Sequence, residues 1–212
     1  MCSSDLYEAV ALAYIEGLEA RAAAGGDLKQ VASVASFFVS RIDTLVDSWI
    51  DAKLKTVTGA DKETLEGLRG KVAIANARLA YQSYKKIFAG PRWEALAKKG
   101  AHVQRVLWAS TSTKNPNYRD VMYVEELIGP DTVNTVPPDT LAAFRDHGRL
   151  RPSLEEDIPG AAAVLNKLEQ VGISLNKATD ELIVEAVKKF VDPYLKLLAT
   201  VERRRHEVSA RA

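Results

Sequence analysis

Two clusters of hydroxyl and cationic side chains each follow a short, mostly apolar stretch of the sequence. The first cluster begins at the end of residues 31–37, which are typical of a parallel strand buried on both faces, and the second follows residues 103–109. Hydroxyl groups, backbone N–H groups at the start of a helix and one cation from each side are suited to binding a phosphate monoester. The candidate site residues are Ser36, Phe38 and Arg41 in the first cluster and Ser110, Ser112 and Lys114 in the second.

Each cluster on its own also has an ordinary structural explanation. Ser36 fits as a small core residue, Arg41 as a surface ion-pair partner, and Lys114 as a solvated loop charge. Phe38 fits either as a wall for a substrate chain or as a core side chain, the commoner role of an aromatic residue at a strand end. The phosphate hypothesis therefore depends on whether the two clusters meet in space.

The elements that would position these side chains alternate between helix and strand. Strands are expected at residues 31–37, 103–109 and 132–136, and since helical segments separate them, they should form a parallel sheet with right-handed crossovers. Helices are expected at residues 5–24, 42–54, 62–88, 92–99, 120–128, 138–148 and 158–171, and in a last segment capped by Thr179. The expected caps of the second and third helices are Asp43 or Thr44 and Asp61 or Thr64.

The number of strands bears on the fold class. Three parallel strands are few for a sheet covered on both faces, and a complete eight-stranded α/β barrel takes about 250 residues. The sequence therefore indicates either a small α/β protein with an excess of helix or the carboxy-terminal half of a (β/α)₈ barrel. In a barrel, the ends of the strands that carry the two clusters are where substrates bind.

Composition excludes several classes of function. The 212 residues are 47% hydrophobic with a net charge of +1, which gives no general reason to expect nucleic acid or an anionic membrane as a partner. The single cysteine, Cys2, excludes an internal disulfide, so a reducing cytoplasmic setting is the default. His102, His147 and His206 do not stand at metal-ligand spacing, and no metal site is expected.

The first six residues, Met-Cys-Ser-Ser-Asp-Leu, match the translated end of a common sequencing adapter. We therefore expect residues 1–6 to be a non-native leader and residues 7–212 to be the native part of one domain. An ordinary disordered start is the alternative.

Four segments carry a resemblance to a known family. Residues 33–44, 69–81, 106–116 and 123–137 resemble, in this order, segments of the longer bacterial transaldolases. The resemblance extends from Leu6 to the carboxy terminus. It implies a partial (β/α)₈ barrel that holds about three parallel strands, numbers six to eight, with their helices.

The resemblance also implies an activity. Transaldolases transfer a dihydroxyacetone unit from sedoheptulose 7-phosphate to glyceraldehyde 3-phosphate, giving erythrose 4-phosphate and fructose 6-phosphate, through a lysine Schiff base and without metal or organic cofactor. By this resemblance Ser36 and Phe38 line the active site, Arg41 grips the phosphate, and Ser110 contributes to the phosphate pocket. Ser112 stands where some members carry an arginine, and we infer that Lys114 supplies that cation instead.

One part of the family pattern is missing from this sequence. The Schiff-base lysine belongs to the fourth strand of the barrel, in a Val-Lys-Ile-Pro-like setting, and the chain has no such segment. Lys114 is a poor substitute because it lies among hydroxyl groups with no sign of the desolvated pocket that lowers a lysine pKa. We therefore expect the chain to bind sugar phosphates but to be inactive alone.

Two alternatives remain open. One is the transaldolase half of a fusion with glucose-6-phosphate isomerase, and the other is a non-catalytic α/β interaction module. Phosphate binding distinguishes the second alternative from the first. The sequence does not predict an oligomeric state.

Overall fold

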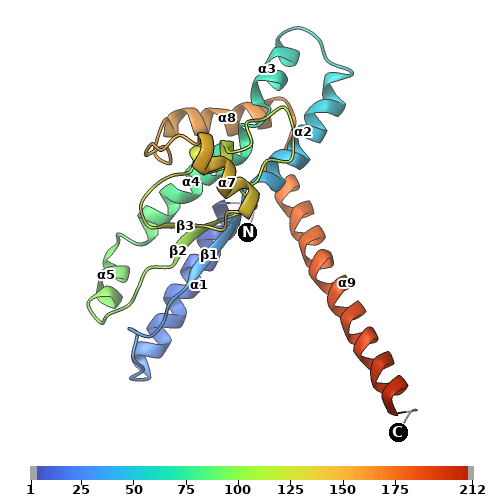
Figure 1. Ribbon diagram of the computed structural model, residues 1–212. Helices are drawn as coiled ribbons and strands as arrows, with labels where there is room; N and C mark the ends of the chain where they lie inside the picture. Colours follow the sequence, from blue (N-terminus) through green and yellow to red (C-terminus); the bar gives the residue numbers. More distant parts are fainter. Residues whose placement is uncertain (1–3, 210–212) are drawn as a thin grey trace.

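The computed structural model describes residues 4–209 and contains a three-stranded parallel sheet beside α1 (Figure 1). The strands are β1 (Val34–Phe38), β2 (Arg105–Ala109) and β3 (Thr132–Asn134), and β2 lies between the other two. Phe38 is paired with Ala109, and Trp108 is paired with Asn134. The predicted α/β fold with three parallel strands is confirmed.

Helices dominate the rest of the described chain. In order they are α1 (Ser4–Ala23), α2 (Ser40–Leu54), α3 (Ala60–Leu68), α4 (Val72–Ile87), α5 (Pro91–Ala97), α6 (Met122–Glu125), α7 (Pro138–His147), α8 (Ile158–Gln170) and α9 (Leu175–Ser209). The predicted excess of helix is therefore also confirmed. Residues 1–3 of the predicted leader lie outside the described residues, while Ser4–Leu6 form the start of α1, so the leader stays a prediction.

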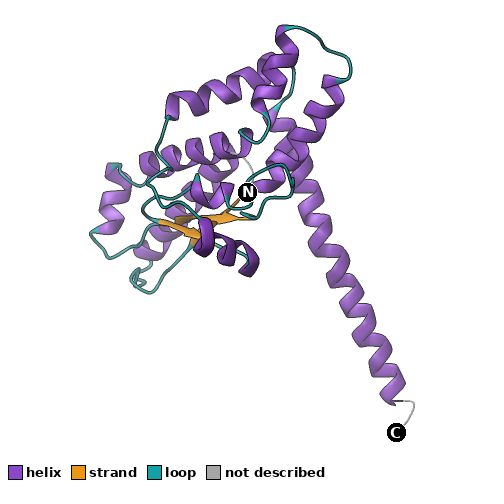
Figure 2. Cartoon of the chain, turned by 45° about the horizontal axis from the view of Figure 1, so that its top comes forward, coloured by secondary structure: helices purple, strands orange, loops and turns teal. Residues whose placement is uncertain are grey.

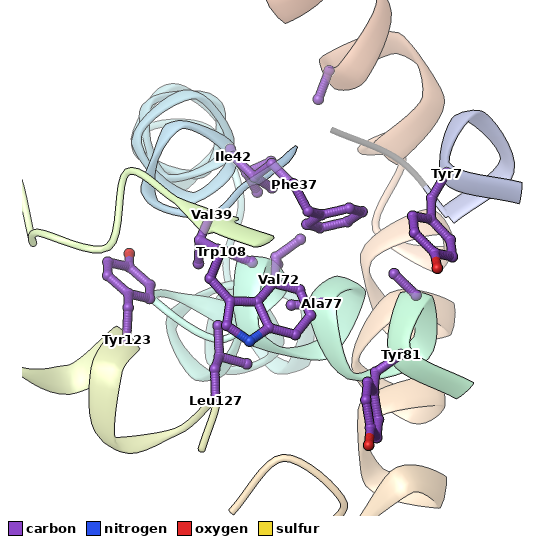
Figure 3. Close-up of a cluster of buried hydrophobic side chains, with 14 of the residues drawn as sticks. Tyr7, Phe37, Val39, Ile42, Val72, Ala77, Tyr81, Trp108, Tyr123 and Leu127 are labelled. Atoms are coloured by element: carbon purple, nitrogen blue, oxygen red, sulfur yellow. The ribbon is translucent and has the colours of Figure 1, made fainter. Parts of the chain in front are cut away.

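The main core lies between the sheet and the helices α1 and α4, which also pack against each other. Phe37 of β1 and Trp108 of β2 are fully buried, and their rings meet edge to face with centroids 5.9 Å apart. Tyr7 of α1 and Ala77 of α4 lie in the same cluster (Figure 3). Burying such large side chains removes much apolar surface from water, and this anchors the two helices to one face of the sheet.

The opposite face of the sheet is open. Successive strand side chains point to opposite faces, so the residues between the core positions share this second face. Val34, Ser36 and Arg105 there are exposed, with Val34 at 40%. Within the described residues, β1 and β3 each pair with β2 only, so both edges of the sheet are also free.

The prediction of one helix over residues 62–88 is wrong. The structure has two helices there, and α3 ends at Leu68 while α4 begins at Val72. Gly70 lies in the connection with φ of +66°, a left-handed conformation that glycine adopts without the steric cost of a Cβ atom. The apolar spacing continues across the break, which is why the sequence pattern did not reveal it.

We expect Gly70→Ala to lower the free energy of unfolding by at least about 1–2 kcal/mol, because a left-handed residue with a Cβ atom is strained. The added Cβ would also lie 2.8 Å from the Tyr118 ring, which must then move. Gly67→Ala is the matched control, since Gly67 lies inside α3 with open space around it. This substitution should raise the free energy of unfolding by up to about 1 kcal/mol, because alanine favours the helix more than glycine does. Urea unfolding followed by circular dichroism measures both changes, and equal stabilities would contradict the expectation.

The predicted helix caps are also wrong. The helix α2 begins at Ser40, three residues before Asp43, and the N–H groups of Val39 and Ser40 bond to the carbonyls of Ala109 and Ser110 across the sheet. Because the neighbouring strand satisfies these amides, the helix start needs no side-chain cap. The hydroxyl groups of Thr44, Thr64 and Thr179 instead donate to carbonyls within their own helices, at Ser40, Ala60 and Asn176 respectively.

The last helix, α9, leaves the body of the molecule and extends away from it (Figures 1 and 2). Only its beginning is packed, where Ala178, Thr179 and Leu182 are buried. Beyond this point it carries exposed apolar residues that include Val184, Val187, Phe190, Val191, Tyr194, Leu195, Leu198 and Val201. Within residues 4–209, no helix is both long and apolar enough to cross a bilayer.

Candidate functional site

The two predicted clusters lie at the same edge of the sheet. The Val39 N–H donates to the Ala109 carbonyl at 2.9 Å, and the Ser40 N–H donates to the Ser110 carbonyl at 3.0 Å. The pairing between β1 and β2 therefore continues to the point where both strands end. Because the strands are parallel, the residues that follow them are brought together, as the phosphate hypothesis requires.

Arg41 lies in the first turn of α2, directly after this edge. Its guanidinium group sits over the ring of Phe38, with Cζ 4.6 Å from the ring centroid, which is a cation–π contact. The aromatic ring thus fixes the direction of the arginine. Arg41 and Lys114 both line one pocket of about 440 Å³, whose wall also includes Thr44 and Ser48 of α2.

The three predicted serines have different positions relative to this pair. Lys114 Nζ donates to Ser112 Oγ at 2.6 Å, so the serine positions the lysine. Ser110 has a left-handed backbone with φ of 57°, and its carbonyl accepts the bond from Ser40 described above. Ser36 lies on the open face of the sheet, two residues before Phe38, and neither it nor the other two serines are among the described residues that line the pocket.

The pocket also contains residues that the sequence analysis missed. Leu182, Glu185 and Lys189 of α9 form its second wall. Lys189 Nζ donates to Glu185 Oε2 at 2.8 Å, and this bond, with the charge of Arg41 as a further cause, lowers the pKa of Glu185. A Glu and a Lys four residues apart on a helix are most often a solvated pair, so the sequence carried no signal for a site there.

A second group of polar residues lies beside the site, on the buried side of α2. Asp43 accepts the Ala73 N–H on Oδ1 and the Tyr123 hydroxyl on Oδ2, both at 2.8 Å. Asp47, one turn later, accepts the Tyr118 hydroxyl at 2.6 Å and the Gly70 N–H at 3.3 Å. Burial raises the pKa of Asp43 to about 7 and also raises that of Asp47.

These two carboxyl groups have a structural role. Ala73 is in the first turn of α4, where N–H groups have no partner within the helix. Asp43 therefore caps α4 from another helix, and it joins α2, α4 and α6 at one point. In the described part of the chain, no three histidine, cysteine or acidic side chains gather in a way that could hold a metal ion.

Comparison with known proteins gives the family. The model of the family described as "Transaldolase/Fructose-6-phosphate aldolase" matches residues 3–201. The chain belongs to this family. The resemblance to transaldolases that the four sequence segments indicated is therefore confirmed.

The relatives also show how much of a transaldolase is present. "Transaldolase" of Trichodesmium erythraeum is 52% identical over 205 residues, which are 95% of this chain and 54% of that protein. "Transaldolase 2" of Nostoc sp. is 53% identical over 196 residues, covering 90% of this chain and 51% of the relative. "Transaldolase" of Parafrankia sp. is 51% identical over 202 residues, covering 93% of this chain and 52% of the relative. The chain thus spans about half the length of the curated relatives it matches.

Proposed function

We propose that this chain is the carboxy-terminal, phosphate-binding part of a transaldolase, and that its sheet corresponds to strands six to eight of the barrel. The observation that supports this most directly is the pocket that Arg41 and Lys114 share at the carboxyl edge of the parallel strands. A guanidinium group held by an aromatic ring and an ammonium group held by a hydroxyl group are suited to a phosphate monoester. In this proposal the ligands are the sugar phosphates of the transaldolase reaction, and the protein acts in the cytoplasm.

In this proposal the chain supplies binding and not covalent chemistry. A Schiff-base lysine needs a lowered pKa, which desolvation or a nearby cation provides. Lys114 is exposed and bonded to Ser112, while Lys189 is 62% exposed and paired with Glu185, so neither amine lies in a desolvated pocket. The amine that captures the ketose therefore comes from the part of the relatives that lies outside the match.

The binding proposal predicts the effect of removing the guanidinium group. Arg41→Ala should weaken binding of erythrose 4-phosphate about tenfold or more, because a hydrogen bond to a charged group contributes about 1.5–3 kcal/mol. Titration followed by NMR chemical shifts measures the dissociation constant. Arg105→Ala is the matched control, since Arg105 is an exposed arginine at the opposite end of β2. Unchanged binding in Arg41→Ala would contradict the proposal and favour an interaction module without a phosphate site.

A further inference from the structure

The pocket at Arg41 is completed by a helix more than 130 residues away in the sequence. Leu182, Glu185 and Lys189 stand at successive turns of α9 and face α2 across the pocket. Leu182 is only 6% exposed, and α9 packs against α2 at this point, so the position of this part of the helix is fixed. Glu185 and Lys189 are themselves exposed and lie one and two turns beyond Leu182.

The charges in this pocket are unbalanced. Three cations, on Arg41, Lys114 and Lys189, line it together with one carboxylate, that of Glu185. Arg41 is directed by Phe38 and Lys114 by Ser112, as described above, and Lys189 is held by Glu185 at 2.8 Å. The pocket therefore has the cations to balance a dianion and contains one internal anion that competes for them.

We propose that Lys189 is a third phosphate-binding cation of this pocket, and that Glu185 competes with the phosphate of the ligand for Lys189 and Arg41. This inference rests on the proposed function, because it assumes that the pocket binds a sugar phosphate. The lowered pKa of Glu185, caused first by Lys189 and also by Arg41, keeps this carboxylate ionised in the unliganded chain. A phosphate dianion carries more charge and more acceptor oxygens than a carboxylate, so it displaces Glu185 when it binds.

Two substitutions with opposite expected effects test this inference. Lys189→Met should weaken binding of erythrose 4-phosphate about threefold to tenfold at low ionic strength, because one cation of the pocket is lost. Glu185→Gln should strengthen it about twofold to fivefold, since the competing anion is removed while the side-chain shape is kept. Both effects should shrink as salt is added, because these groups are exposed to solvent.

Lys188→Met is the matched control. Lys188 is exposed and adjacent to Lys189 on the same helix, but it is not among the residues that line the pocket. Its removal changes the net charge by the same amount, and binding should stay within about twofold of the unmodified chain. NMR titrations of the full chain with erythrose 4-phosphate and with inorganic phosphate measure all three variants.

The possible outcomes separate this inference from the proposed function. If Arg41→Ala abolishes binding while Lys189→Met leaves it unchanged, the role of Lys189 is wrong and the proposed function stands. If Lys189→Met and Lys188→Met weaken binding equally, the effect is one of net charge and the inference is again wrong. If the unmodified chain binds neither phosphate compound, both the inference and the proposed function are wrong.

Discussion

Addition of a polypeptide that corresponds to the amino-terminal part of a transaldolase relative should generate transaldolase activity that neither polypeptide has alone. The chain exposes one face and both edges of its sheet within the described residues, and it matches about half of each relative. Exposed strand edges and apolar residues on an open sheet face favour association with further strands. A coupled assay that follows erythrose 4-phosphate formation measures the gain.

A substitution on the open face should prevent this gain. Val34→Glu places a charge on a face that the added strands would bury, and because Val34 is 40% exposed, the chain itself should remain folded. Leu12→Glu is the matched control, since Leu12 of α1 is also 40% exposed but lies on an outer helix. Activity restored equally in both variants, or no activity from two folded polypeptides, would contradict the expectation.

Asp43→Ala should lower the free energy of unfolding by about 2–5 kcal/mol, the largest stability effect that we expect from a single substitution. It leaves the Ala73 N–H and the Tyr123 hydroxyl buried without their acceptor, and each such group costs about 1–3 kcal/mol. Asp43→Asn is the conservative variant because it keeps the shape and one carbonyl oxygen. Thermal unfolding followed by circular dichroism compares the three proteins, and an alanine variant as stable as the unmodified chain would exclude the capping role.

The same residue gives a pH dependence with a defined sign. Burial raises the pKa of Asp43 from an ordinary value of 3.8 to about 7, so the folded state retains this proton where the unfolded state has lost it. The contribution of Asp43 to stability is therefore complete below about pH 4 and is lost as the pH rises through 7. Asp47, whose pKa is also raised by burial, acts in the same direction, and Tyr118 and Tyr123 donate to this pair.

Asp43→Asn should weaken this pH dependence, since an amide does not ionise in this range. Between pH 4 and pH 8, the free energy of unfolding should therefore fall less for the variant than for the unmodified chain. Urea unfolding at a series of pH values measures the difference. Parallel curves for the two proteins would show that the carboxyl group of Asp43 keeps an ordinary pKa.

The parts of the fold that the sequence predicted are those with a strong local signal. Residues 31–37 and 103–109 are short, mostly apolar stretches between helical segments, and this pattern predicted the parallel strands found at Val34–Phe38 and Arg105–Ala109. The meeting of Arg41 and Lys114 followed from the same reasoning, because parallel strands bring their carboxyl ends to one edge. Both predictions needed only the direction of the strands and no detail of side-chain packing.

The parts that could not be predicted depend on contacts between distant segments. Asp43 has the residue type and position of a local helix cap, but its partners are the amide of Ala73 and the hydroxyl of Tyr123. Lys189 is an ordinary helix-surface lysine until α9 is placed against α2. Gly70 interrupts an alanine-rich pattern whose spacing continues across it, so only the backbone conformation reveals the break.

The carboxyl group of Asp43 also constrains the order in which the chain can assemble during synthesis. Its two oxygens close loops of 30 and 80 residues, to Ala73 and to Tyr123. When α4 leaves the ribosome, α2 is already available to complete its first turn, whereas the tyrosine arrives only after β2 has been made. The bond from Ala73 to Asp43 can therefore form first, and the second carboxylate oxygen gains its partner only when Tyr123 has been synthesised.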